Sequence, residues 1–418
     1  MVNETEVAII GGGAAGSGAA RRLHDAGVPC LIIEARGRLG GRAWTFRDHG
    51  GFPLDLGCGW LHSAERNPWT TIAERQGRTI DRTPPPWTRL SLGNGFPPEE
   101  QRAFIAAQRA FYERLDEAGE GEPDRPASAL LDPNDRWNNL IGAVSTYVTG
   151  AEPDQVSVID FARYNDDGVN WRVVDGLGTT IAAHAAGVPA VLDCAVHCID
   201  HTGSRLAIET ARGTIAADRA IVTVPSALLA QEALRFRPAL PAKIEAAAGL
   251  PLGLADKLFL SLAQPEEFPP NSRLFGRTDR TATATYHLRP FGRPLIECYF
   301  GGSNAGELEK GGQAAFFDFV LAELTGLLGS AFAPRVAPVG LHCWRNDPFA
   351  RGSYSFALPG RADGRAVLAA PVDERLFFAG EACSRHDFST SHGALLTGLV
   401  AAEAVIATRS KGRGRRVG

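Results

Sequence analysis

Apolar and polar positions in the first fifty residues predict a strand, a helix and a second strand. Residues 6–10 (EVAII) form an apolar run rich in β-branched residues, which is typical of a buried strand. Residues 14–26 repeat small apolar residues at helical spacing and stop at Gly27. A second apolar run, CLIIE, closes the unit at Glu34. This order of elements is that of a βαβ unit.

A glycine-rich turn joins the first strand to the helix. Gly11, Gly13 and Gly16 have the spacing G-x-G-x-x-G. In this motif the first glycine permits the turn, the second lets the backbone approach a pyrophosphate, and the third lets helix and strand pack closely. Glu34 ends the second strand, where a carboxylate accepts hydrogen bonds from both hydroxyls of an adenosine ribose and repels a 2′-phosphate. The unit therefore predicts a bound dinucleotide and disfavours NADP.

Two further glycine-containing segments predict more contacts with the dinucleotide. Residues 35–42 (ARGRLGGR) follow Glu34 directly; Gly40 and Gly41 expose backbone N–H groups beside Arg42, which can pair with a phosphate. A simple nicotinamide site does not require this loop. Near the C-terminus, LFFAGEACSRHDF predicts a buried strand that ends in Gly380 and Glu381. We expect these two residues at a second cofactor-facing turn.

Composition and charge narrow the class of protein. The chain has 418 residues, is 44% hydrophobic and carries a formal net charge of −4, which gives no sign of a nucleic-acid partner. Its seven cysteines follow no regular framework, so we expect free thiols and a cytoplasmic location. We expect neither a signal peptide nor a membrane anchor, and we interpret the basic end RSKGRGRRVG as a disordered solubilising tail.

Together these motifs resemble the flavin amine oxidase family, which includes the monoamine and polyamine oxidases. The resemblance rests on E-A-R-x-R-x-G-G-R at 34–42, G-W-L-H at 59–62 and F-A-G-E at 378–381. It continues through DGLG at 175–178, CAV at 194–196, IVTVP at 221–225, GSY at 352–354 and HGA at 392–394. It implies an FAD-dependent oxidoreductase that acts on a small-molecule amine.

The resemblance also implies roles for individual residues. Glu34 is expected to bind the adenosine ribose, Arg42 the pyrophosphate, Val196 the adenine through its backbone and Glu381 the ribityl region. The residues expected to bind FAD are Gly11, Gly13, Ala15, Gly16, Glu34, Ala35, Arg36, Gly40, Gly41, Arg42, Gly59, Trp60, Val196, Trp344, Gly380, Glu381, Gly393 and Ala394.

Three residues are the candidate catalytic groups. In the family, a lysine at the place of Lys257 bonds through a water to flavin N5, where hydride arrives. The alternative is that Lys257 lies at a strand end and extends its ammonium into solvent. Trp344 is expected near the isoalloxazine, and Tyr354 is expected to form one aromatic wall of the substrate cavity, whose apolar surroundings favour a neutral amine.

Two positions depart from the family pattern. Ser353 stands where some members carry the cysteine that bonds covalently to the flavin, so we expect non-covalent FAD. The second aromatic wall falls near Thr390 or Ser391, which are small hydroxyl residues. Candidates for a replacement ring are Phe388, Trp60 and Tyr164.

Several histidines and cysteines invite other interpretations. Cys194, His197, Cys198 and His201 lie close in sequence, but an extended strand sends the cysteines and the histidines to opposite faces, so we expect no zinc site. We expect His62 and His392 to have structural or cofactor-positioning roles, because hydride transfer from a neutral amine needs no general base.

The spread of the motifs predicts a discontinuous domain. We expect an α/β, Rossmann-like FAD-binding domain of residues 1–80, 176–237 and 344–418, and a mixed α+β substrate-binding domain of residues 81–175 and 238–343. In the second domain, EEQRAFIAAQRAFYERLDEA predicts a helix that roofs the cavity, and LGLADKLFLSL predicts a half-buried strand. LIECYF predicts another strand and AAFFDFVLAELTGLL an amphipathic helix.

The expected reaction is oxidation of a C–N bond by hydride transfer to flavin N5, followed by hydrolysis of the imine and reoxidation by O2 to give H2O2. The alternatives are a desaturase or dehydrogenase of a C–C bond and a non-catalytic FAD-binding protein. Amino acids also stay open as substrates, because an arginine in the cavity could bind a carboxylate. The sequence does not select that arginine, and it leaves open a monomer or a homodimer.

Overall fold

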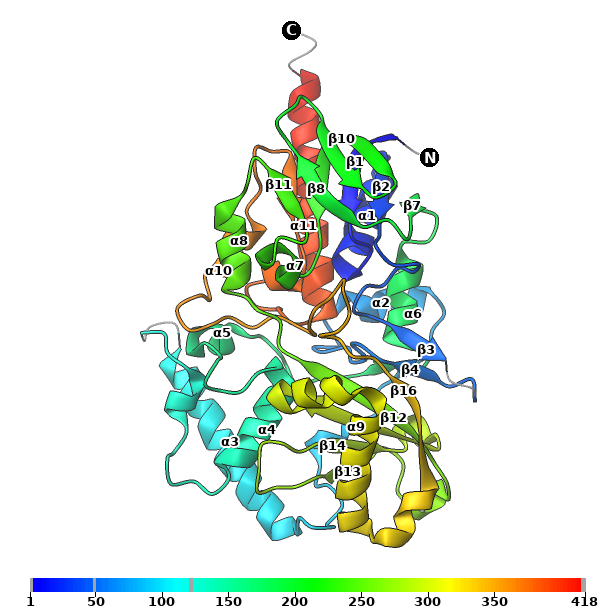
Figure 1. Cartoon of the computed structure of the whole chain (residues 1–418), viewed down its shortest axis with the longest axis vertical. Coiled ribbons are helices and arrows are strands. Elements are labelled where there is room, and N and C mark those ends of the chain that lie inside the picture. Colours follow the sequence, from blue (N-terminus) through cyan, green and yellow to red (C-terminus); the bar gives the residue numbers. More distant parts are fainter. Residues whose placement is uncertain (1–2, 48–49, 120–122, 415–418) are drawn as a thin grey trace.

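The computed structural model describes residues 3–47, 50–119 and 123–414. The chain forms two halves, each built on its own sheet (Figure 1). The upper half in Figure 1 has eight strands, ordered β11-β8-β9-β10-β1-β2-β7 with β17 paired to β10. The lower half has five strands, ordered β13-β14-β15-β12-β16. The first and last elements, β1 and α11, both lie in the upper half, so the chain leaves that half and returns to it.

The upper sheet has a parallel centre. The parallel strands are β1 (Glu4–Ile10), β2 (Cys30–Ile33), β7 (Ala190–Val191), β10 (Gly213–Val222) and β17 (Leu376–Phe378). An antiparallel extension adds β9 (Leu206–Thr210) and β8 (Val196–Asp200), and β11 (Arg235–Arg237) runs parallel to β8. The βαβ unit expected at the N-terminus is present as β1, α1 (Ala14–Asp25) and β2.

Helices cover both faces of this sheet, because successive strand residues point to opposite sides. Val7, Ile9 and Ile32 pack against α1 and α11 (Ser391–Gly414). Ala8 and Ile10 belong to a second cluster with residues of three short helices, α7 (Ser226–Ala230), α8 (Pro241–Ala248) and α10 (Gly364–Ala369). Near-continuous apolar runs such as EVAII are therefore buried on both sides.

The lower sheet is antiparallel and has one apolar face and one mixed face. Its strands are β12 (Ala255–Leu262), β13 (Ser272–Phe275), β14 (Thr285–Leu288), β15 (Leu295–Gly301) and β16 (Val336–Leu341). Leu258, Tyr286 and Cys298 join the core that includes Phe316 and Val320 of α9 (Gly302–Leu328). The expectation of a half-buried strand around Lys257 was wrong, because β12 is also covered on its other face, where Phe259 packs against Leu54 and Leu56.

The remaining elements cover this sheet and connect the halves. The helix expected in residues 99–118 is α3 (Pro98–Ala118), which packs with α4 (Asn138–Thr149) and α5 (Val158–Arg163) around an aromatic core. Between the halves lie α2 (Pro68–Arg75), α6 (Leu177–His184) and the strand pair of β3 (Thr45–Arg47) with β4 (Pro53–Asp55). A second short pair joins β5 (Ile80–Asp81) to β6 (Arg172–Val173). The short 3₁₀ turns are η1 (Pro86–Thr88), η2 (Ala127–Leu130), η3 (Pro265–Glu267), η4 (Pro290–Gly292), η5 (Ser330–Arg335) and η6 (Glu381–Cys383).

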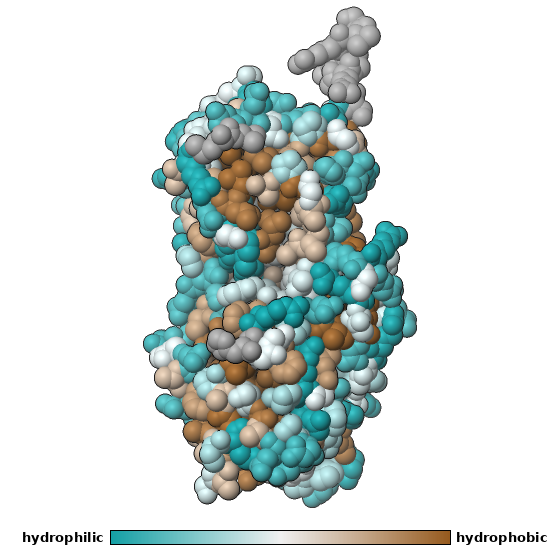
Figure 2. Space-filling model, turned by 90° about the vertical axis from the view of Figure 1, so that its right-hand side faces the viewer, coloured by the Kyte–Doolittle hydropathy of each residue, from teal (hydrophilic) through white to brown (hydrophobic). Residues whose placement is uncertain are grey.

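The C-terminal helix differs from the expectation. Residues Ser391–Arg409 are long and apolar enough to cross a membrane by length and composition, with a mean hydropathy of 1.3. Ala394, Ala402 and Val405 nevertheless pack against α1 and the sheet, as in a core helix. Over the molecule as a whole, the face shown in Figure 2 carries apolar patches in both halves, among hydrophilic side chains. The tail expected to be disordered is helical to Gly414, and residues 415–418 lie outside the described residues.

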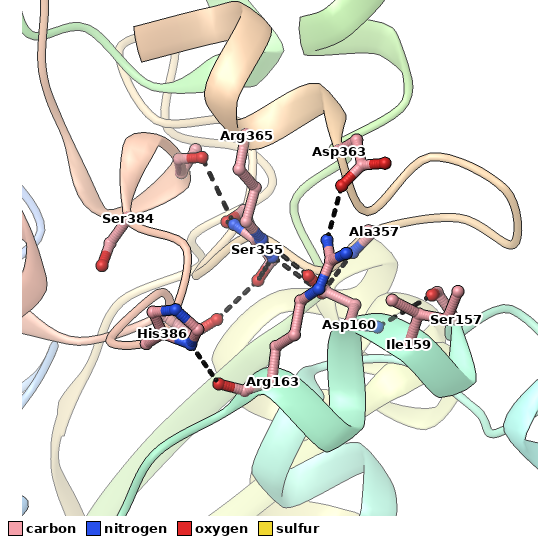
Figure 3. A network of polar contacts seen from close by, with 12 residues as sticks. Ser157, Ile159, Asp160, Arg163, Ser355, Ala357, Asp363, Arg365, Ser384 and His386 are labelled. Atoms are coloured by element: carbon pink, nitrogen blue, oxygen red, sulfur yellow. Dashed lines mark hydrogen bonds and ion pairs between the residues drawn. The ribbon is translucent and has the colours of Figure 1, made fainter. Parts of the chain in front are cut away.

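A buried ion pair joins α5 of the lower half to α10 of the upper half (Figure 3). Arg365 Nε and Nη2 donate to the two carboxylate oxygens of Asp160 at 2.7 and 2.8 Å, and both side chains are 1% exposed. Arg365 Nη1 also donates to Ser355 Oγ, which donates to Glu381 at 2.6 Å. The contact between the halves is thus connected to a predicted FAD-binding residue.

We expect Asp160→Ala to lower the free energy of unfolding by roughly 3–5 kcal/mol, because it leaves the Arg365 guanidinium buried without its counter-charge. Denaturant unfolding of the purified protein measures this loss. Glu74→Ala is the matched control, since Glu74 also pairs with an arginine, Arg82, but the two side chains are 49% and 55% exposed. We expect little change from the control, and equal losses in the two variants would contradict the assignment.

Candidate active site

A cavity of about 800 Å³ is lined by residues of both halves. It begins at the carboxyl ends of β1 and β2 and reaches the mixed face of the lower sheet. It brings together most of the residues singled out in the sequence, namely Gly11, Gly13, Ala15, Glu34, Ala35, Arg36, Gly40, Gly41, Arg42, Gly59, Trp60, Val196, Lys257, Trp344, Tyr354, Gly380, Glu381 and Ala394.

Two of the predicted residues, Gly16 and Gly393, do not line the cavity, and the structure gives each a packing reason. A Cβ on Gly16 would lie 1.9 Å from the carbonyl oxygen of Gly11, and a Cβ on Gly393 would lie 1.9 Å from that of Asp387. Gly13 is different, since a Cβ there would have no protein atom closer than 3.9 Å. Packing does not explain that glycine, whereas a phosphate group held against the backbone does.

The residues around Gly13 fit the nucleotide half of FAD. Glu34 is 3% exposed and accepts hydrogen bonds from the N–H groups of Gly12 at 2.7 Å and Arg36 at 2.8 Å. A carboxylate has about four acceptor positions, so these two bonds fix Glu34 and leave capacity for ribose hydroxyls. Gly41 approaches Gly13 closely and has φ +59°, which explains a glycine in the second loop.

The two arginines of the second loop are held by carboxylates. Arg36 contacts Asp347 at 2.5 Å, and Arg42 Nη1 donates to Glu381 at 2.9 Å and to the Ser353 carbonyl at 2.7 Å. Burial acts to raise the pKa of Glu381, but Arg42 and the Ser355 hydroxyl lower it overall. Arg42 and Glu381, distant in sequence, therefore form one rigid unit on the cavity wall.

Two buried acids hold the turn that carries Trp344. Asp256 accepts a hydrogen bond from the Trp344 N–H, and Glu309 accepts from those of Arg345 and Asn346. Burial, and then the charge of Glu309, raises the pKa of Asp256 well above its ordinary range. Trp344 itself is 2% exposed, and its Nε1 donates to the Leu56 carbonyl.

Lys257 lies inside the protein and does not extend into solvent. It is 5% exposed, and its ammonium group donates to the carbonyl oxygens of Asp55 at 3.0 Å and Gly57 at 2.8 Å. It also lies 3.2 Å from Glu297 Oε1. An ammonium has three N–H donors, so these three acceptors satisfy it completely. Lys257 therefore fixes residues 55–57 on the cavity wall and places a positive charge beside it.

Glu297 connects Lys257 to a second buried cation. Its other oxygen accepts from Arg172 Nη1 at 3.0 Å. Burial acts to raise the pKa of Glu297. The positive charges of Arg172 and then Lys257 nevertheless bring this pKa down to about 2. His287 lies 3.9 Å from the same carboxylate, but burial and Arg172 lower its pKa to about 3, so it is neutral at physiological pH. The cluster therefore holds two cations and one anion.

Tyrosines form the aromatic part of the cavity wall. The Tyr354 hydroxyl donates to the Tyr147 carbonyl at 2.7 Å and lies 3.2 Å from the Tyr299 hydroxyl. Of the three rings considered for the missing second wall, Trp60 and Tyr164 line the cavity. Phe388 instead packs against Tyr164 and the Arg365 guanidinium. The hydroxyl residues Ser389, Thr390 and Ser391 line the cavity where the ring was expected.

The other residues discussed from the sequence have local partners. Ser353 Oγ donates to the Ala255 carbonyl and accepts from its N–H, both at 2.9 Å. His62 lines the cavity and contacts Asn170 at 2.6 Å, whereas His392 is buried beside Asn67 and Asp387. The simple alternation expected for residues 194–201 was wrong, because β8 begins at Val196 and the ladder shifts register between Val196 and Cys198.

Sequence reasoning missed Glu297, Tyr299, Arg273 and His287. All four lie on the same face of the lower sheet as Lys257, and all line the cavity. Within LIECYF, Glu297 and Tyr299 are two residues apart, which places them on one face. That spacing was visible in the sequence, but the pairing of this strand with β12 was not.

Comparison with known proteins agrees with this geometry. The model of the family described as flavin containing amine oxidoreductase matches residues 15–90 and 98–406. Polyamine oxidase 4 of Oryza sativa subsp. japonica is 30% identical over 95% of this chain and 88% of its own length. Lysine-specific histone demethylase 2 of Homo sapiens is 25% identical over 96% of this chain and 53% of its own length. A wild-type putrescine oxidase structure bound to putrescine superposes with a TM-score of 0.76 at 17% identity, covering 97% of this chain and 99% of that one.

The chain belongs to the flavin-containing amine oxidoreductase family. It is an FAD-dependent oxidoreductase that oxidises amines, and the C–C desaturase alternative is not favoured. The α/β fold with a Rossmann-like domain and a mixed second domain is confirmed. The domain boundaries and the roles of individual residues stay predictions.

We expect Gly13→Ala to fold normally but to lose bound FAD, because the added methyl group meets open cavity where a phosphate would lie. Gly16→Ala is the contrast, since its methyl group would collide with the Gly11 carbonyl and disturb the turn itself. Flavin absorbance per protein measures FAD content, and thermal unfolding of the FAD-free proteins measures the fold. Normal FAD content in Gly13→Ala would show that the cofactor does not approach this backbone.

Proposed function

We propose that the chain oxidises a small amine in the cavity between its two halves, with O2 as the electron acceptor and H2O2 as a product. The observation that carries the proposal is the continuity of the cavity. The same walls hold the nucleotide-type residues Gly13 and Glu34 at one end and Lys257 with Tyr354 at the other. A cofactor bound at the first end would thus reach a substrate held at the second.

FAD, when bound, accepts a hydride from the carbon beside the amine nitrogen. The protein's task is to orient the substrate and to keep its nitrogen unprotonated. The aromatic side chains of Tyr354, Tyr299 and Trp60 surround the substrate with surface of low polarity, which disfavours an ammonium ion. Lys257 and Arg172 add positive charge nearby, which shifts the amine further towards its neutral form.

Several finer features belong to the same proposal. FAD is held without a covalent bond, because Ser353 has no thiol with which to form a thioether. Lys257 supports the reacting region by its charge and by fixing the carbonyl groups of Asp55 and Gly57. The location is cytoplasmic, in keeping with seven free cysteines.

The direct test is reduction of the flavin by amines without oxygen. We expect at least one member of a panel of primary amines, secondary amines, polyamines and amino acids to bleach the yellow protein. Readmitting air is then expected to restore the colour and to release peroxide. A yellow protein that no amine bleaches would contradict the proposal and favour a non-catalytic flavoprotein, and recovery of colour without peroxide would exclude O2 as a two-electron acceptor.

We expect Lys257→Met to retain FAD and to slow flavin reduction or reoxidation by at least ~10-fold. The variant removes a charge that stands close to the reacting region, and such preorganised charges contribute a few kcal/mol. Stopped-flow spectroscopy follows the two half-reactions separately. Lys310→Met is the control, because Lys310 is exposed and pairs with Glu307 three residues away. Unchanged rates in Lys257→Met would remove this lysine from the catalytic set.

A further inference from the structure

One face of the lower sheet carries two rows of side chains, and every member of the two rows except Phe259 lines the cavity. Lys257, Tyr299, Thr285 and Phe275 are successive cross-strand partners and form the first row. Phe259, Glu297, His287 and Arg273 form the second row, two residues along each strand. Arg273 therefore lies three strands away from β12, on the same face as Lys257.

Most charged groups on the cavity wall have an oppositely charged partner. Glu297 lies between Lys257 and Arg172, Arg36 contacts Asp347, and Arg42 contacts Glu381. Asp166 lies 3.7 Å from His62. His287, the direct cross-strand neighbour of Arg273, is neutral because its pKa is lowered to about 3 by burial and by Arg172.

Arg273 lies on the cavity wall without such a partner among the described residues. Its Nε donates to Thr285 Oγ1 at 2.9 Å, and its guanidinium lies over the Phe275 ring at 3.9 Å. Within residues 3–47, 50–119 and 123–414, no carboxylate forms an ion pair with Arg273, and its two terminal nitrogens have no hydrogen-bond partner. Burial lowers its pKa to about 10, while nearby Tyr147 acts to raise it, so the side chain is charged at neutral pH.

The fixed Nε and the aromatic ring leave the two terminal nitrogens of Arg273 oriented as a fork, the geometry that matches a carboxylate. We propose that Arg273 binds the carboxylate of the substrate, which is then an amino carboxylate and not a diamine or polyamine. This inference rests on the proposed amine oxidation and adds the chemical class of the amine.

The spacing of the strands sets where the carboxylate must be. Neighbouring strands lie about 4.8 Å apart, so the backbones at Lys257 and Arg273 are separated by about 14 Å across the sheet. An α-amino acid carries its carboxylate on the carbon that loses hydride, and it is too short to reach from one region to the other. The substrate therefore has its carboxylate several carbons from the oxidised C–N bond.

The charges of the cavity also disfavour a polycation. A second ammonium group at the far end of a diamine would lie near the unneutralised guanidinium of Arg273. Like charges in a partly buried site repel strongly, whereas a carboxylate at that point gains a charge-assisted, two-point contact. Arg273 therefore favours amino carboxylates as substrates and disfavours diamines and polyamines.

The test compares matched substrates on the FAD-loaded enzyme. The probes are ω-amino carboxylates of four, six and eight carbons, the diamines of the same lengths, and the corresponding monoamines. Hexanoate, which has no amine to oxidise, reports carboxylate binding alone by calorimetry. The variants are Arg273→Gln, Arg273→Lys and Arg273→Glu. The control is Arg277→Gln, because Arg277 is exposed and pairs with Asp279.

We expect the wild type to prefer at least one ω-amino carboxylate over the diamine of equal length in kcat/KM. Arg273→Gln should weaken hexanoate binding and raise the KM of that substrate by roughly 10- to 100-fold, with monoamine kinetics unchanged. Arg273→Lys should recover part of the loss, Arg273→Glu should reverse the preference towards the diamine, and Arg277→Gln should behave as the wild type.

Three results would overturn the proposal. They are a wild type that prefers the diamines, an Arg273→Gln variant with unchanged hexanoate affinity, and an equal loss for monoamines and amino carboxylates, which would show that Arg273 only packs on Phe275. Calorimetry separates this inference from the proposed function. If hexanoate binds in an Arg273-dependent way but no amine bleaches the flavin, amine oxidation is refuted and the carboxylate site is retained. If amines bleach the flavin but hexanoate does not bind in this way, the carboxylate site is refuted and amine oxidation is retained.

Discussion

An extended strand sends neighbouring side chains to opposite faces, and in β12 this alternation separates two kinds of chemistry. Asp256 points to the α9 side, where it lies near Glu309 and accepts a hydrogen bond from the turn of Trp344. Lys257, the next residue, points to the cavity and holds residues 55–57. A slip of one residue in the pairing of β12 with β15 would exchange the two groups and destroy both sites. The register of this sheet is therefore the constraint on which the cavity depends.

The position of Glu297 follows from the same register and controls the charge of the cavity. One carboxylate lies between two buried cations, Lys257 and Arg172, and a third basic group, His287, stays neutral beside it. Burying an unpaired ammonium or guanidinium costs several kcal/mol, so each cation depends on this acid. The cluster of Lys257, Arg172 and Glu297 still has an excess of positive charge, which suits a substrate that must react as a neutral amine. Arg273 adds a further positive charge to the same cavity wall.

The sequence was most informative where local chemistry determines structure. The βαβ unit, the glycine spacing and Glu34 could be predicted because a turn, a phosphate and a ribose each demand particular residues within a short segment. The family resemblance then supplied Lys257, Trp344 and Tyr354. The ion pairs of Arg42 with Glu381 and of Arg365 with Asp160 join segments hundreds of residues apart, and no local pattern indicates them. That Arg273 has no carboxylate partner in the described part of the chain also follows from the tertiary structure, because the fold places the nearby acids beside other arginines.

The order of strands in the upper sheet has a consequence for synthesis of the protein. β1 is made first, but its neighbour β10 begins at Gly213, and β17, which pairs with β10, begins at Leu376. Glu381 and Ala394, which line the same cavity as Gly11, come later still. The nucleotide end of the cavity is therefore incomplete on the ribosome until nearly the whole chain has emerged. Until then the apolar surface of β1 and α1 lacks α11, and the nascent chain must be protected from aggregation before it acquires its flavin.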